Sequence, residues 1–191
     1  PGTTLEWFTL IHENWLLGLI MMDFFDIANY AFVGIIFFTL YYVLKDTNEI
    51  YMRFANIICF IGIAVYFASN QAFTMLALSD RYFAASEVDN SVFLAAGEAI
   101  LALMNQGSGS YVCLFLIGLS GLTISIIMLQ GNVFSRITAY FGILANGLGL
   151  SFFITIIIFP TIGWIPIPLS SIPLMIWYIL IGVKLYKLSR E

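Results

Sequence analysis

Polar side chains that could bind a ligand recur at three places in an otherwise apolar sequence. Asp23, Asp26 and Tyr30 are spaced three and four residues apart, which places them on one face of a helix. Further along the chain come two neighbouring amides and a single acid within an apolar run. Such groups are costly at membrane depth and often mark functional sites there. The predicted ligand-binding residues are Asp23, Asp26, Tyr30, Asn70, Gln71 and Glu98.

Each of these groups also has a structural explanation, and the sequence leaves both explanations open. Asp23 and Asp26 could lie at the membrane interface, where the start of a helix favours carboxylates. Asn70 and Gln71 could join neighbouring helices by hydrogen bonds. Glu98 could point to water if its helix lies on the membrane surface, or close an outward-facing cavity if that helix folds back.

The residues that would support catalysis or metal binding are sparse. His12 is the only histidine, and it cannot be matched by spacing to a nucleophilic serine. A single imidazole with carboxylates does not resemble a closed zinc site. The two aspartates share one helix, whereas an acid and a base usually face each other across a gap. We therefore predict no catalytic residue, no metal site and no cofactor, and we favour a non-enzymatic role.

The elements that position these residues must lie in a lipid bilayer. The chain has 191 residues, of which 61% are hydrophobic and only 9% are charged, too few to solvate a water-soluble globule. We predict an all-α integral membrane fold, a single helical domain over 1–191 with about five transmembrane helices plus interfacial helices. The expected spans are about 20–44, 54–79, 111–130, 136–159 and 170–188, with an outer connection at 80–109.

Uncharged intervals of about 20 residues or more define these spans. The first two spans come from the uncharged intervals 27–44 and 54–79. Turn-forming residues at 105–110 interrupt the third interval, and four prolines and a glycine divide the fourth into two spans. Before the first span, residues 1–19 predict a short interfacial helix that carries Trp7, Phe8, Trp15 and Leu16.

The positive charges predict an orientation. Alternating connections place six of the seven Lys and Arg residues on one side of the membrane and leave only Arg81 on the other. Because positively charged connections tend to stay in the cytoplasm, we expect a cell-membrane protein with its amino terminus outside and its carboxyl terminus in the cytoplasm. The net charge is -4, and no basic patch indicates nucleic-acid binding.

The carboxyl-terminal half contains a recognisable pattern of packing and loop residues. It runs through IMLQGNVFSR at 127–136, TAYFGILANG at 138–147, IWY at 176–178 and GVKL at 182–185. This pattern resembles a prokaryotic family of multi-pass membrane proteins known only as a domain of unknown function. The resemblance extends from about the first span to the last. It implies six or seven helices, hence a further helix upstream, and supplies no catalytic residues.

Three functions are compatible with these residues. The first is binding or transport of a small polar or amphipathic ligand at a pocket in the outer half of the membrane. The second is a non-catalytic accessory subunit whose small-residue and aromatic faces pack against other membrane chains. The third is an intramembrane enzyme that uses the outer carboxylates on a lipid-like substrate. The expected partners are the lipid bilayer, a small or lipid-like ligand, and other membrane subunits.

Overall fold

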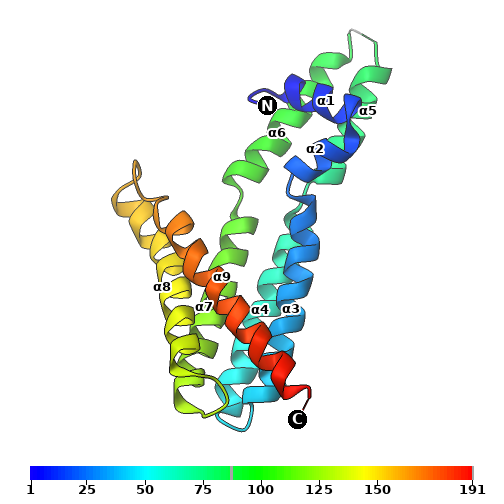
Figure 1. The fold of residues 1–191 in the computed structure, drawn as a ribbon. Coiled ribbons are helices and arrows are strands. Elements are labelled where there is room, and N and C mark those ends of the chain that lie inside the picture. Colours follow the sequence, from blue (N-terminus) through cyan, green and yellow to red (C-terminus); the bar gives the residue numbers. More distant parts are fainter. Residues whose placement is uncertain (87, 191) are drawn as a thin grey trace. The chain divides into compact units, whose positions relative to one another are not determined.

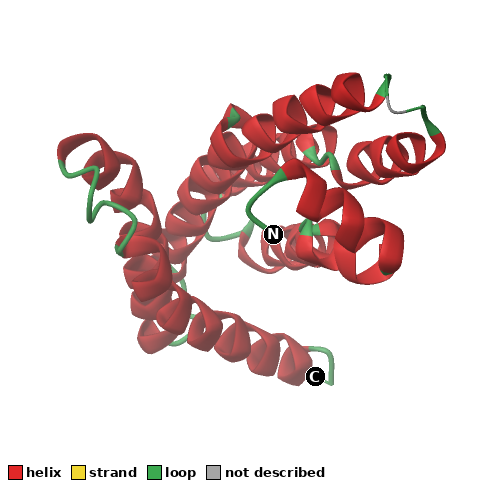
Figure 2. Cartoon of the chain, turned by 90° about the horizontal axis from the view of Figure 1, so that it is seen from above, coloured by secondary structure: helices red, strands yellow, loops and turns green. Residues whose placement is uncertain are grey.

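The computed structural model describes residues 1–86 and 88–190, without the side chains of residues 105 and 106. Its described part is built from helices joined by short connections (Figure 1). The helices are α1 Thr4–Glu13, α2 Trp15–Met21, α3 Phe24–Leu44, α4 Glu49–Ser69, α5 Ala72–Ala84, α6 Asn90–Gln106, α7 Ser108–Gln130, α8 Arg136–Ile158 and α9 Pro166–Leu188. No strand occurs in the described residues (Figure 2). The predicted all-α class is confirmed.

Five helical segments of the described chain are long and apolar enough to cross a membrane. They are Phe24–Leu44, Glu49–Ala84, Asn90–Gln130, Arg136–Ile158 and Pro166–Leu188. The second and third have 36 and 41 residues and each contains a helix interruption. About 20 residues cover the hydrocarbon core, so these two are much longer than one crossing requires. The chain is an integral membrane protein.

The chain divides into two compact units. The first comprises residues 1–32 and 64–111, and the second comprises residues 33–63 and 112–191. The division falls within α3, α4 and α7, so each of these helices contributes residues to both units.

The first unit has its own apolar core, formed where α1, α2 and α5 pack together. Its most buried members are Phe8, Ile11, Leu19, Met22, Ala72 and Met75. The Ser79 hydroxyl of α5 donates a 2.8 Å hydrogen bond to the Phe8 carbonyl of α1. Gly97 lets α6 approach the same core, because a Cβ there would lie 2.7 Å from the Phe8 ring. The region predicted as an outer connection, 80–109, therefore supplies α6 to a packed helical unit.

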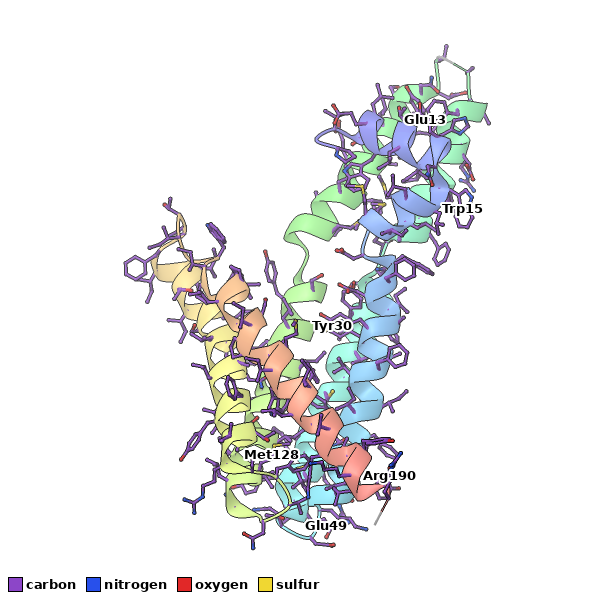
Figure 3. The ribbon with its side chains drawn as sticks, in the orientation of Figure 1. Glu13, Trp15, Tyr30, Glu49, Met128 and Arg190 are labelled. Atoms are coloured by element: carbon purple, nitrogen blue, oxygen red, sulfur yellow. The ribbon has the colours of Figure 1, made fainter. Side chains whose placement is uncertain are left out.

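Asn14 forms the corner between α1 and α2. Its backbone N–H donates to the Leu10 carbonyl at 2.9 Å, which ends α1. Its side-chain oxygen accepts from the Leu17 N–H at 3.0 Å, which caps the start of α2. Glu13 and Trp15 flank this corner (Figure 3). One asparagine thus turns what could have been one helix into two.

Small residues allow close helix packing in the second unit. The Ser120 hydroxyl of α7 donates to the Ala55 carbonyl of α4 at 2.7 Å. Gly142 of α8 leaves room for Trp177 of α9, since a Cβ there would lie 2.4 Å from the indole nitrogen. The Trp177 ring meets the Phe37 ring of α3 edge-on, with centroids 6.2 Å apart. Small-residue contacts of this kind are typical of membrane helices.

Candidate functional site

Three of the helix interruptions in the first unit adjoin one another. Residues 22–23 separate α2 from α3, residues 70–71 separate α4 from α5, and residue 107 separates α6 from α7. Residues next to all three interruptions line one cavity, which we call the helix-break cavity. Its lining residues are Asp23, Tyr66, Ser69, Asn70, Gln71, Leu103, Met104, Gly109 and Ser110. These three breaks therefore meet at one place.

The backbone of Asp23 joins the first interruption to the second. Asp23 has a left-handed backbone with φ 56°, which ends the helical path of α2. Its carbonyl oxygen accepts from the Tyr66 hydroxyl at 3.3 Å and from the Asn70 side-chain amide at 3.5 Å. The Asp26 N–H also donates to this oxygen, at 3.1 Å. The carbonyl, rather than the carboxylate, thus holds the two breaks together.

Side chains at the second interruption satisfy much of its own backbone. The Asn70 side-chain oxygen accepts from the Ala72 N–H at 3.2 Å at the start of α5. The Ser69 hydroxyl donates to the Tyr66 carbonyl at 3.1 Å near the end of α4. The Gln71 side-chain oxygen accepts from the Thr74 hydroxyl at 2.9 Å. This break is a capped structure with defined polar partners.

The third interruption approaches the second through a glycine. An added Cβ at Gly109 would lie 2.3 Å from both the Cβ and the Oγ of Ser69. Only a residue without a side chain allows α7 to start so close to the end of α4. The Gly107 N–H ends α6 by donating to the Leu103 carbonyl at 2.8 Å.

The helix-break cavity is small and contains one carboxylate. Its volume is about 40 Å³, room for about three water molecules at roughly 10–15 Å³ for each one. Asp23 precedes the apolar span Phe24–Leu44. Although the residue as a whole is exposed, partial desolvation of its carboxyl, and secondly the negative charge of Asp26, raise its pKa. A ligand with a positive charge would relieve both effects.

The structure places three of the six predicted ligand-binding residues in the cavity lining, namely Asp23, Asn70 and Gln71. Asp26 and Tyr30 lie further along α3, outside the lining. Figure 3 labels Tyr30. Tyr30 packs its ring against that of Tyr66, with centroids 4.4 Å apart.

Glu98 is exposed on α6 and does not line the cavity.

The other lining residues of the cavity were not predicted as ligands from the sequence. They come from the ends of α4 and α6 and the start of α7. Tyr66 is only 7% exposed and looks like an ordinary aromatic of a membrane span. Gly109 and Ser110 belong to the turn-forming stretch at 105–110. That stretch indicated a break in the apolar interval, but nothing in the sequence indicated that it meets residues 69–71.

His12 and the two cysteines take no part in this site. The His12 ring stacks on Phe83 with centroids 4.1 Å apart. Cys59 and Cys113 are both free and buried. Within the described residues, no group of three or more His, Cys, Asp or Glu is placed to hold a metal ion.

Comparisons of the chain with protein-family models, curated proteins and solved structures found no match. The family resemblance seen in the sequence therefore stays a prediction. The functional argument depends on the geometry of the helix-break cavity.

Proposed function

We propose that this integral membrane protein binds a small polar ligand in the helix-break cavity and acts as a binding protein or carrier. The observation that supports this proposal is that three helix interruptions and one carboxylate line the same cavity. Non-helical backbone in a membrane protein is tolerated where protein buries it or where it lines a polar cavity. Interrupted helices also form the substrate and ion sites of many transporters.

The cavity chemistry favours binding of a small ligand over an amphipathic one. The volume of about 40 Å³ matches a small polar group. The lining combines the Asp23 carboxylate with hydroxyl and amide groups, which can orient a polar ligand. The proposed transport uses this site, because it lies where three helix interruptions meet.

Ligand-induced stabilisation of the purified protein tests this function. Thermal unfolding in mild detergent is measured with sodium, glycine, phosphate and choline, each at matched ionic strength. At least one of these probes should raise the Tm saturably by binding the folded state. Asp23→Asn should abolish that rise, whereas the control Glu98→Gln, an exposed change in the same unit, should retain it. The proposal fails if no probe stabilises the protein, or if Asp23→Asn responds like the wild type.

We also propose that the amino terminus lies outside the cell membrane and the carboxyl terminus in the cytoplasm. Support comes from the connection between α3 and α4, the start of α8 and the end of α9, which carry basic residues. In a variant with Cys59 and Cys113 changed to Ala, single cysteines can be placed by Val88→Cys and Asn132→Cys, both at exposed positions. A membrane-impermeant maleimide should label only the first in intact cells. Labelling of only the second would reverse the topology.

A further inference from the structure

The charges of the first unit are strongly unbalanced. Residues 1–32 and 64–111 contain eight of the eleven acidic residues of the chain but only one of its seven Lys and Arg residues, Arg81. Arg81 lines a different surface groove, with Asp89 and Phe93 among its neighbours. The helix-break cavity thus has a carboxylate in its lining and no cationic side chain. A cationic ligand would balance the charge of this carboxylate.

Resting on the proposed function, we infer that the ligand is a small monovalent cation, such as sodium or potassium, held by the Asp23 carboxylate and neutral oxygens. The neutral oxygens available in the lining are the hydroxyls of Ser69 and Ser110 and the side-chain carbonyl of Asn70. The Ser110 hydroxyl has no hydrogen-bond partner among the described residues, so its oxygen is free to face an ion. Hard cations of this kind prefer oxygen ligands.

The number of carboxylates supports a single positive charge. Divalent calcium takes six to eight oxygens and usually several carboxylates. Asp23 is the only acidic residue in the cavity lining. Asp26 lies outside the lining, and its negative charge acts on Asp23. One monovalent ion neutralises Asp23 and lowers the repulsion between the two acids.

The volume supports an inorganic ion over an organic one. About 40 Å³ accommodates an ion with a few of its waters. We expect this lining of oxygens to bind sodium or potassium more tightly than choline, because methyl groups cover the choline nitrogen. Choline is the matched control, since it carries the same charge.

Direct binding measurements test this inference on the whole protein. Purified wild-type protein in detergent is incubated with ²²Na⁺ or ⁸⁶Rb⁺, the latter as a potassium analogue, in choline chloride of constant ionic strength. Saturable binding of at least one ion is expected, and Asp23→Asn should weaken it by about tenfold or more, the size expected for losing a charged partner. Glu98→Gln should bind like the wild type. Absence of saturable binding of both ions to the wild type overturns the inference.

The outcomes separate the cation inference from the proposed function. If glycine stabilises the protein through Asp23 while neither ion binds, the cavity is a ligand site but the cation inference is wrong. If Asp23→Asn does not fold, Ser110→Ala serves as the second variant. This variant removes one neutral oxygen, and it should weaken ion binding while leaving the unfolding temperature without ions unchanged. Ion binding to Ser110→Ala that equals the wild type would overturn the assigned ligand set.

Discussion

The backbone and the side chain of Asp23 have different roles in the proposed site. The backbone, at φ 56°, turns the chain between α2 and α3. Its carbonyl receives hydrogen bonds from Tyr66, Asn70 and Asp26. These contacts do not use the carboxylate. Asp23→Asn therefore tests the charge while keeping the backbone contacts.

The raised pKa of Asp23 predicts a dependence of stability on pH. Desolvation and the charge of Asp26 raise the pKa of this carboxyl above its ordinary value of 3.8. A group with a raised folded-state pKa contributes stability below the ordinary value, and this contribution is lost as pH rises through the raised pKa. Without added sodium or potassium, the Tm of the wild type relative to Asp23→Asn should fall as pH rises from about 4 to about 7.

The groups that face Asp23 make this comparison specific. Asp26 of α3 is its acidic neighbour and Tyr66 of α4 is a phenol, while the lining from α6 and α7 supplies Leu103, Met104, Gly109 and Ser110, none of which titrates. Subtracting the Asp23→Asn curve removes the titration of the other acids to first order. A difference in Tm that rises with pH would contradict the account.

At the residue level, sequence reasoning found the polar members of the site but not their partners. Asp23, Asn70 and Gln71 stand out because polar groups are rare in apolar intervals. The hydrogen bond from Tyr66 to the Asp23 carbonyl depends on a left-handed backbone that aspartate tolerates but does not require. Phe8, predicted on an interfacial helix, is fully buried in the core of the first unit. Pattern alone cannot tell an aromatic that faces lipid from one that faces protein.

At the scale of elements, the site depends on how closely α7 starts beside the end of α4. Gly109→Ala places a Cβ 2.3 Å from Ser69, so the two helix ends must move apart. We expect a loss of about 1–3 kcal/mol of stability, as for other overpacked sites. Gly147→Ala on α8 is the matched control, because a Cβ there meets nothing within 4 Å. Thermal unfolding of the two variants measures the difference.

A compensating change makes the Gly109 test decisive. Ser69→Gly removes both atoms that the new Cβ would meet, so the double variant Gly109→Ala with Ser69→Gly should regain part of the lost Tm. If Gly109→Ala is as stable as Gly147→Ala, the close approach of α7 to α4 is wrong. These unfolding measurements use no ligand, so their outcome tests only the fold of the site.

Helix positions followed from the sequence where charge and proline mark the ends. Helix α8 covers 136–158 against an expected 136–159, and α7 ends at residue 130 as expected. Helix α4 starts earlier, at Glu49, where the Asn48 side-chain oxygen caps it by accepting from the Tyr51 N–H at 3.4 Å. The interruption at 70–71 was not foreseen, since asparagine and glutamine also occur within helices. Its cause is tertiary, because the Asn70 amide bonds to Asp23 of another segment.

At the scale of the whole molecule, charge is segregated along the chain. Residues 33–63 and 112–191 contain six of the seven Lys and Arg residues, and the first unit contains most of the acids. This segregation agrees with one orientation in a membrane and with an acidic environment around the helix-break cavity. An acidic unit concentrates cations near the cavity and repels anions. Cation binding in the helix-break cavity should therefore weaken as rising ionic strength screens these charges.

An experimental structure of the wild-type protein in lipid, prepared with sodium at neutral pH, tests the central claim most directly. We expect non-protein density in the helix-break cavity, in contact with the Asp23 carboxylate and the Ser110 hydroxyl. The same preparation of Asp23→Asn should lack this density. A cavity closed by its own side chains, or a ligand bound elsewhere while this cavity stays without density, would contradict the account.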